Sequence, residues 1–381
     1  MKIGIDCRTI LNPNGGERAG VGHYTYYLVK NLLKIDKTND YVLFMDHRAR
    51  GIRDFDQKNV KLKFFKFSEY KKYLPFYYSH LAIAKDIKQE ELDVLHAPAN
   101  VIPMKYNGPT VLTIHDMAIY KHPSWFPAGQ KFSVNVLVPS SIKRAKKVIA
   151  VSQSTKKSIV TLMKTDPKKI SVVYEAGEKS KQPTNKAINK TLKKFKLNEN
   201  YIFSMGTLEV RKNVTRLIKA WEKICLKDPK KMAGWQLAIA GGKGYKFADV
   251  FKTIKTSKIG HKIRYIGYVS HEEKYALLKQ AAVFAFPSLW EGFGLPVLEA
   301  MNTGTPVLTS RISSLPEVAG KAAVLVNPNK IDDISKGLEK LLKNKTTRTK
   351  YSKLGTTQTK KFTWQKTAQE TLKIYLEVAK S

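Results

Sequence analysis

Two glutamates frame a glycine-containing turn in the C-terminal half of the chain. Glu291 and Glu299 are separated by seven residues, and residues 292–296 between them have the pattern Gly-x-Gly-x-Pro. The run before the turn, 281–287, reads as a buried strand, and an apolar helix is expected from Val297. Backbone N–H groups and the dipole at a helix N-terminus favour bound anions. The pattern therefore predicts a helix end that binds a diphosphate, flanked by acids that hold sugar hydroxyls.

Two adjacent cations, Arg211 and Lys212, follow a predicted strand and Gly206. Cations beside a glycine turn suit a diphosphate leaving group, because they neutralise the charge that grows as the bond to the phosphate breaks. The simpler interpretation is a basic helix start. Cations are unfavourable at the positive end of a helix dipole, so the first interpretation is favoured.

Two further groups of candidate residues lie in the N-terminal half. His115 and Asp116 directly follow a predicted strand, where a lone histidine is more often a structural hydrogen-bonding group than a catalyst. Gly20 and Gly22 lie in a loop that also contains Gly15 and Gly16 and precedes a predicted helix. Glycines there let the backbone approach a ligand closely, although a tight turn is the simpler interpretation.

The stretch from Glu291 to Glu299 is similar to the E-x7-E signature of retaining glycosyltransferases of the GT-B architecture, in particular glycosyltransferase family 4. Other segments that resemble family landmarks occur in family order at 113–116, 148–152, 206–213, 300–307 and 313–318. The resemblance covers nearly the whole chain. Such an ordered set is far more specific than one isolated pair of acids.

The resemblance implies a role for each candidate residue. It implies that Glu299 binds the ribose hydroxyls of the donor, that Glu291 contacts the donor sugar, and that His115 lies near the reacting carbon. His115 and Glu291 are thus the expected catalytic residues. The expected contacts of the donor diphosphate are Arg211, Lys212, Gly22, Gly292, Phe293, Gly294 and Leu295. The candidate acceptor contacts are Gly20 and Asp116, and Asp116 could instead orient His115.

The same resemblance implies a hexosyltransferase that is retaining and metal-independent. The donor would be a nucleotide-diphosphate sugar, linked to GDP, UDP or ADP, and the acceptor a glycan or a lipid-linked molecule in surface-polysaccharide or glycolipid synthesis. The motifs are similar to those of surface-polysaccharide transferases, many of which are mannosyltransferases. No cofactor is expected. The sequence departs from the common family pattern at Thr207, where an arginine usually follows the glycine, so Arg211 is expected to supply that guanidinium.

One motif of the other glycosyltransferase architecture also occurs. Asp54, Phe55 and Asp56 spell the D-x-D of metal-dependent enzymes, but they lie in a charged segment, 50–63, rather than at a strand end. We interpret this match as a coincidence and expect no metal site.

The charge leaves a second class of function open. The chain has 381 residues with 68 Lys and Arg against 31 Asp and Glu, a net charge of +37. Such charge suits nucleic acid, anionic lipid or mere solubility. The basic residues are scattered and no recognition-helix or aromatic RNA-binding pattern occurs, so nucleic acid is not expected. The alternative to an enzyme is a basic α/β binding protein. Basic segments at 143–147 and 156–157 fit either a membrane surface or solvated helix faces.

Localisation is expected to be cytoplasmic, with attachment to the inner membrane surface left open. The start of the chain reads as a strand rather than a signal peptide, and no apolar run approaches the roughly 20 residues needed to span a bilayer. Two cysteines, Cys7 and Cys225, suit a reducing compartment.

Alternating strand and helix patterns predict the elements that position these residues. They favour an α/β fold of GT-B type, with two Rossmann-like domains whose parallel sheets face each other across a cleft. The expected division is an acceptor-binding domain at 1–178, a polar linker at 179–198, a nucleotide-sugar-binding domain at 199–363 and a final helix at 364–381. That helix packs either back on the first domain or within the second.

Every motif follows a predicted strand, as ligand sites in open α/β sheets do. The expected strands are 2–6, 41–45, 94–96, 110–114, 148–151, 201–205, 235–240, 263–265, 283–286, 306–309 and 323–326. The expected helices are 24–33, 81–90, 130–145, 155–162, with Ser152 as N-cap of the last, and 272–280 and 364–378.

Overall fold

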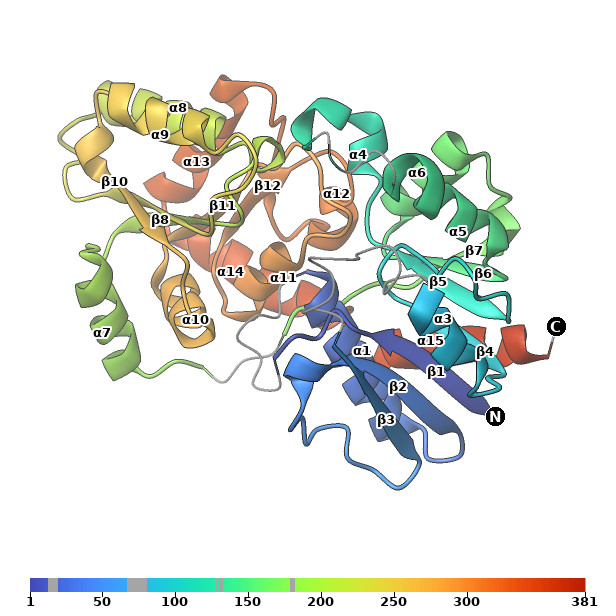
Figure 1. The fold of residues 1–381 in the computed structure, drawn as a ribbon. Coiled ribbons are helices and arrows are strands. Elements are labelled where there is room, and N and C mark those ends of the chain that lie inside the picture. Colours follow the sequence, from blue (N-terminus) through green and yellow to red (C-terminus); the bar gives the residue numbers. More distant parts are fainter. Residues whose placement is uncertain (13–19, 67–80, 128, 130–132, 179–181, 381) are drawn as a thin grey trace. The chain divides into compact units, whose positions relative to one another are not determined.

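The computed structural model describes residues 1–12, 20–66, 81–127, 129, 133–178 and 182–380. The chain forms two compact units (Figure 1). Unit 1 comprises Met1–Lys121, Ala128–Glu175 and Thr363–Ser381, and unit 2 comprises His122–Pro127 and Ala176–Phe362. The loop expected to contain Gly15 and Gly16, and the start of the helix expected at 130–145, lie outside the described residues.

Unit 1 is built on a parallel sheet of seven strands. In spatial order these are β3 (Val60–Phe65), β2 (Asp40–Asp46), β1 (Lys2–Cys7), β4 (Val94–Ala97), β5 (Thr110–Ile114), β6 (Lys147–Ala150) and β7 (Ile170–Val172). The central strands are apolar runs because helices cover a parallel sheet on its faces. All five residues of β5 are buried. The strand order reverses between β1 and β4, as in a doubly wound fold.

Six α-helices accompany this sheet among the described residues. They are α1 (Val21–Ile35), α3 (Ile83–Lys88), α4 (Ala118–Lys121), α5 (Val138–Arg144), α6 (Gln153–Met163) and α15 (Trp364–Ala379). A π-helical stretch, Ser133–Leu137, leads into α5. Ser152 is the N-cap of α6, since its side chain accepts from the Thr155 N–H, which confirms that prediction.

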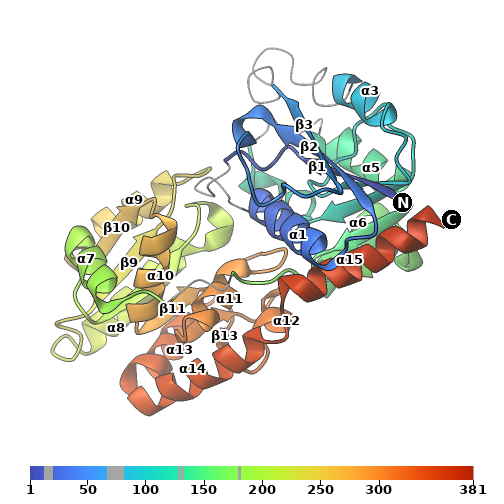
Figure 2. The same cartoon turned by 90° about the horizontal axis from the view of Figure 1, so that it is seen from below.

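The C-terminal helix α15 belongs to unit 1 and packs on α1 (Figure 2). The Trp364 ring stacks on Tyr27 of α1, with centroids 5.5 Å apart. Thr367 Oγ1 donates to the Tyr174 carbonyl at 2.7 Å. The helix begins at its Thr363 cap, whose side chain accepts from the Lys366 N–H. The last residues of the chain therefore complete the first unit.

Unit 2 contains a second parallel sheet with the same reversal of order. Its strands are β10 (Ile263–Gly267), β9 (Gln236–Ala240), β8 (Tyr201–Met205), β11 (Val283–Phe286), β12 (Val307–Ser310) and β13 (Val324–Val326). Its helices are α7 (Asn185–Phe195), α8 (Val214–Lys227), α9 (Ala248–Thr256), α10 (His271–Gln280), α11 (Leu295–Asn302), α12 (Leu315–Ala319), α13 (Ile331–Lys343) and α14 (Lys345–Thr359). The two Rossmann-like sheets confirm the predicted fold class.

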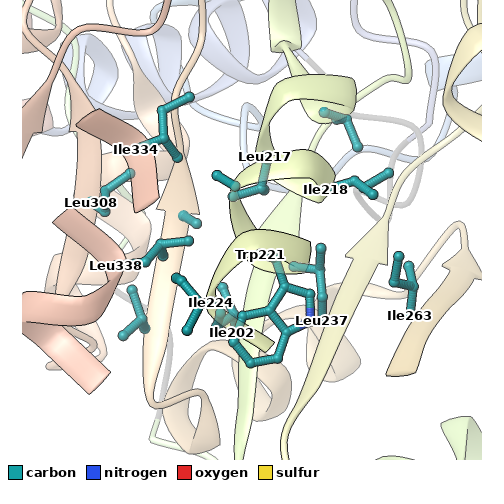
Figure 3. Close-up of a cluster of buried hydrophobic side chains, with 14 of the residues drawn as sticks. Ile202, Leu217, Ile218, Trp221, Ile224, Leu237, Ile263, Leu308, Ile334 and Leu338 are labelled. Carbon is teal, nitrogen blue, oxygen red and sulfur yellow. The ribbon is translucent and has the colours of Figure 1, made fainter. Parts of the chain in front are cut away.

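A buried cluster under α8 forms the core on one side of this sheet (Figure 3). Trp221 is fully buried, and it lies among Ile202 of β8, Leu237 of β9 and Leu338 of α13. Burying a large apolar side chain of this kind contributes about 1.5–3 kcal/mol. The cluster fixes α8 on β8 and β9, and hence the short segment before α8 that carries Arg211 and Lys212.

The segment predicted as a polar linker, 179–198, is described from residue 182 onward, and most of that part is helical. Residues 185–195 form helix α7, which packs on α10 within unit 2. Thr184 caps it by accepting from the Ala187 N–H, and few apolar residues suffice because one face alone is buried. Unit 1 ends its long segment at Glu175, three residues before the predicted boundary at 178.

Candidate active site

The acids and cations of unit 2 lie at the point where its strand order reverses. Arg211 and Lys212 follow β8 in a short 3-10 turn, and Glu291 follows β11, the strand that pairs with β8. Ligands of open α/β sheets bind outside the carboxyl ends of strands at this switch point. Residues 79 to 80 positions apart in sequence therefore meet at one edge of the sheet.

Glu291 is held by both cations. Lys212 Nζ lies 2.6 Å from its Oε1, and Arg211 Nη1 lies 2.8 Å from its Oε2. Arg211 also binds Glu209 through Nη2 at 2.7 Å. Lys212 Nζ lies 4.8 Å from the centroid of the Phe286 ring, so its ammonium is enclosed between a carboxylate and an aromatic face. The cations predicted to bind diphosphate are thus assembled, with glutamates as their present partners.

The charge pair sets the protonation of Glu291. Burial by itself raises the pKa of this carboxyl, but the Lys212 and Arg211 charges outweigh burial and hold the pKa below its ordinary value. Glu291 is 7% exposed and ionised at neutral pH. An ionised acid between two cations binds and orients rather than donating a proton.

The residue after Lys212 explains how the cations are positioned. Asn213 adopts a left-handed conformation with φ of 59°, and it begins α8. Its side-chain amide donates to the carbonyls of Pro287 at 2.9 Å and Pro328 at 2.8 Å. Because Pro287 precedes the loop to Glu291, Asn213 joins the two halves of the charge cluster. Asn213 ends the segment 206–213 that resembles a family landmark, and this contact was not predicted from the sequence.

The glycine turn is fixed by two serines. Ser314 Oγ donates to the carbonyls of Glu291 at 2.9 Å and Phe293 at 2.6 Å, and the Glu291 N–H donates to Ser313 Oγ at 3.1 Å. Gly294, the N-cap of α11, has φ of 123°, and a Cβ there would meet Leu315 at 2.9 Å. The predicted diphosphate-binding segment, Gly292 to Leu295, therefore forms the rigid entry to α11.

Glu299 lies on α11 and is paired as well. Lys274 Nζ of α10 lies 2.7 Å from Glu299 Oε1, and the two side chains are 15% and 8% exposed. The predicted ribose acceptor thus has one oxygen bound to a lysine that sequence reasoning did not single out.

An aromatic group adjoins Glu291 within unit 2. His122 stacks on Trp125, with centroids 4.0 Å apart, and its ring meets Trp290 edge-on at 5.9 Å. Lys246 Nζ donates to the Ser124 carbonyl at 3.2 Å. The short segment 122–127 therefore packs on unit 2 although its neighbours in sequence belong to unit 1. Nothing in the sequence indicated this assignment.

In unit 1, His115 follows β5 with both ring nitrogens engaged. Its Nδ1 lies 3.0 Å from Glu175 Oε1, and its Nε2 lies 2.8 Å from the Pro98 carbonyl oxygen. The His115 N–H donates to Asn100 Oδ1 at 2.9 Å, which fixes the backbone. The Tyr24 ring packs edge-on against the imidazole at 4.8 Å.

The structure gives Asp116 a backbone contact, and its acceptor role stays a prediction. Asp116 Oδ1 accepts from the Ala118 N–H at 3.0 Å and so starts α4, while Glu175 is the acid at the His115 ring. Burial alone lowers the pKa of His115, but the hydrogen bond and charge of Glu175 and the Pro98 carbonyl raise it above its ordinary value. Glu175, which follows β7, was missed from sequence.

The glycines before α1 have local reasons for their identity. Gly20 is the N-cap of α1 with φ of 55°, a conformation that side chains disfavour. A Cβ on Gly22 would lie 2.6 Å from the Thr9 carbonyl oxygen, so the helix start packs directly on the backbone after β1. The turn is therefore required by packing, and a ligand contact at either glycine stays a prediction.

A buried polar chain links the C-terminal helix to the strand that carries His115. His96 Nδ1 lies 2.7 Å from Tyr375 Oη of α15, and its Nε2 lies 2.7 Å from Thr113 Oγ1 of β5. Thr113 Oγ1 lies 3.2 Å from Tyr24 Oη. Burial lowers the pKa of His96 to about 3, with the charge of His115 acting in the same direction, so His96 is neutral. This chain fixes the surroundings of His115 without adding a charge.

The D-x-D match behaves as a surface feature. Asp54 pairs with Lys30 at 3.1 Å and accepts a hydrogen bond from the Tyr26 hydroxyl, while Phe55 is fully buried.

Among the residues that the structure describes, no helix is both long enough and apolar enough to cross a lipid bilayer.

Family models match both halves of the chain. Residues 18–176 match glycosyltransferase family 4, and residues 185–358 match glycosyl transferases group 1. An O-antigen chain mannosyltransferase of Salmonella typhimurium is 30% identical over 270 residues, which are 71% of this chain and 69% of that protein. Another, O-antigen chain mannosyltransferase B of Escherichia coli, is 29% identical over 284 residues, 74% of each chain.

Solved structures show the same fold. Sucrose-phosphate synthase from Thermosynechococcus elongatus superposes with a TM-score of 0.75 at 16% identity, covering 99% of this chain and 98% of that one. The Anabaena protein HepE, in complex with UDP-glucose, gives 0.74 at 16% identity, covering 99% and 100%. The family models and sequence relatives support glycosyl transfer and not a basic α/β binding protein. The chain belongs to the family 4, group 1 glycosyltransferases and is a glycosyltransferase of the GT-B class.

Proposed function

We propose that the protein transfers a hexose from a nucleotide-diphosphate sugar to a glycan or lipid-linked acceptor in surface-polysaccharide or glycolipid synthesis. The observation that carries this proposal is the cluster at the switch point of unit 2. Two cations, two glutamates and a helix N-terminus lie together there, which suits the phosphates and hydroxyls of such a donor. Mannose is the first sugar to test, because the two relatives are named as mannosyltransferases.

The donor diphosphate would bind Arg211 and Lys212 by sharing them with Glu291. A guanidinium has five N–H donors, so Arg211 can keep its glutamates and still donate to a phosphate oxygen. As the bond to the sugar breaks, these cations would neutralise the growing charge on the leaving group. Glu291 would contact the donor sugar and Glu299 the ribose through the oxygen that Lys274 does not hold.

We propose a reaction that retains the anomeric configuration and needs no metal. Glu291 is clamped by two cations, so it is poorly suited to act as a nucleophile like that of a retaining glycosidase. A front-face reaction fits instead, in which an oxygen of the leaving diphosphate helps deprotonate the acceptor on the same side. The cations do the work that a metal ion would otherwise do.

The test is a donor screen followed by product analysis. Purified protein is incubated with GDP-, UDP- and ADP-linked sugars, with and without EDTA, and release of the nucleoside diphosphate is measured. NMR of the anomeric linkage in the product then decides the stereochemistry. An α-linked donor should give an α product, and a β product would overturn the retaining mechanism. Loss of activity in EDTA would overturn metal independence.

Membrane attachment follows only if the acceptor is lipid-linked. Part of the +37 charge would then meet anionic lipid at the inner membrane surface. Co-sedimentation with anionic vesicles should exceed that with neutral vesicles and fall steeply with salt. Equal binding to both kinds of vesicle at low salt would contradict this attachment.

A further inference from the structure

The hydrogen bonds of His115 fit a ring with protons on both nitrogens. The Pro98 carbonyl oxygen can only accept, so Nε2 carries a proton. Glu175 Oε1 also accepts when it is ionised, so Nδ1 then carries the second proton. An imidazole whose nitrogens face a carbonyl and a carboxylate is satisfied as an imidazolium.

We propose that Glu175 is a positioning residue that keeps His115 doubly protonated and fixed in orientation, and that this charged form of His115 is the one that works in transfer. The proposal rests on the proposed function, and on the placement of His115 near the reacting carbon that the family resemblance implies. Glu175 is 4% exposed and lies beyond β7, two strands away from β5 in the sheet. Its side chain reaches across the end of β6 to the imidazole.

One other placement of protons would satisfy the same contacts. A neutral His115 could accept at Nδ1 from a protonated Glu175. Among the described residues, the surroundings favour the charged pair, because Asp116 is a further acid that acts on His115 and the nearby His96 and Tyr24 are neutral. The pKa of His115 is raised on this account, since Glu175 and Asp116 outweigh the effect of burial.

The consequence for transfer is specific. An imidazolium with both N–H groups engaged has no lone pair, so His115 does not take the proton of the acceptor. Its positive charge opposes a developing cation at the sugar and favours the developing negative charge of the leaving diphosphate. In this form His115 assists the departure of the diphosphate and does not stabilise positive charge at the sugar.

The first test reads the protons directly. Full-length protein labelled with ¹⁵N-histidine is studied by NMR at neutral pH, and the His115 signals are assigned by their loss in His115→Asn. Wild type should show protons on both ring nitrogens. Glu175→Gln keeps the shape of the side chain but removes its negative charge. Its amide can donate a hydrogen bond to Nδ1, so His115 should lose its Nδ1 proton. A wild-type ring with one proton at neutral pH would overturn the proposal, whatever the activity.

A matched control separates this effect from the loss of any buried acid. Glu90 is equally buried in unit 1, is surrounded by lysines, and makes no described contact with His115. Glu90→Gln should leave the His115 signals in place. If both variants moved these signals equally, the special role of Glu175 would be lost.

The second test uses the pH profile of kcat with the donor found above. Loss of the Nδ1 proton should move the alkaline limb of kcat to lower pH by about one to three units in Glu175→Gln. KM for the donor should stay near the wild-type value, and Glu175→Asp should recover part of the profile. An unshifted limb, or a change confined to KM, would contradict the proposal. If wild type transfers no sugar at all, the proposed function fails while the NMR result still decides the protonation.

Discussion

Units 1 and 2 place charge at their strand ends in opposite ways. In unit 2 a buried carboxylate, Glu291, is held by two cationic side chains from a neighbouring loop. In unit 1 a ring that carries the positive charge, His115, is held by one carboxylate and one backbone carbonyl. Side-chain cations can exchange partners when a ligand arrives, whereas a carbonyl of the folded chain cannot move away.

This difference suggests a division of labour. The charge cluster of unit 2 carries two positive and two negative charges, on Arg211, Lys212, Glu209 and Glu291. A diphosphate would bind there by taking over part of the contacts that the two cations make with the glutamates. The His115 site is pre-organised and has little to exchange. We expect unit 2 to determine donor affinity and unit 1 to determine turnover.

The largest expected effect is on turnover in unit 1. His115→Ala should lower kcat by about 10²–10³, the usual cost of losing one pre-organised electrostatic group. Donor affinity, measured by calorimetry, should stay near wild type because the phosphate contacts lie elsewhere. Circular dichroism checks that the variant is folded. A variant with normal kcat and weakened donor binding would reverse the proposed division.

The next effect is on donor affinity in unit 2. Lys212→Ala and Glu299→Ala should each weaken donor binding by about 1.5–3 kcal/mol, the worth of one charge-assisted contact. Lys212→Ala also leaves Glu291 with Arg211 as its remaining described cation, so a drop in stability is expected beside the drop in affinity. If both variants bound the donor normally, the binding site would lie elsewhere.

Several features of both sites followed from the sequence alone. The strand-end positions of His115, Arg211 and Glu291 were predictable, because apolar runs of strand length precede each of them. The helix start at the glycine turn was predictable from its Gly-x-Gly-x-Pro pattern. These features depend on local order, which periodicity and turn residues report well.

Partners brought together by the fold were not predictable. Glu175 meets His115 only because β6 and β7 follow β5 in the sheet, and β7 itself was too short to recognise. Strand β3 was taken for a charged loop because Lys61 and Lys63 interrupt it. In the fold these two lysines share a face and bind the buried Glu90, which removes the cost of placing charge there.

A smaller effect on ligand binding tests the proposed contact of Glu299 with the ribose. Lys274→Met removes the ammonium that holds Glu299 Oε1 and should weaken binding of a nucleoside diphosphate by about 1 kcal/mol. Binding of pyrophosphate should not change, since the ribose contact is absent from it. Lys279→Met is the matched control on the same helix, where the lysine donates only to a backbone carbonyl. Equal weakening for both ligands would mean that Lys274 serves the phosphates.

The smallest expected effect is on stability, at Glu90 in unit 1. Glu90 is a buried acid held by cations, like Glu291, but it lies away from the proposed site. Three lysines, Lys2, Lys61 and Lys63, lie within 3.2 Å of Glu90. Burial raises the pKa of Glu90, but these lysines outweigh it and lower the pKa from 4.5 to about 2. A carboxyl whose pKa is lower in the folded chain contributes stability above its unfolded pKa and loses it as pH falls.

Glu90→Gln should therefore lower the free energy of unfolding by about 1 kcal/mol near pH 6, since solvent screens the exposed lysines. The difference from wild type should shrink as pH falls from about 4.5 towards 2, because the wild-type carboxyl then takes up its proton. Urea unfolding at several pH values measures it. Donor affinity and kcat should not change, because Glu90 serves the sheet and not the reaction. A difference that stayed constant or grew at lower pH would show that the ionised Glu90 carboxylate is not the stabilising group.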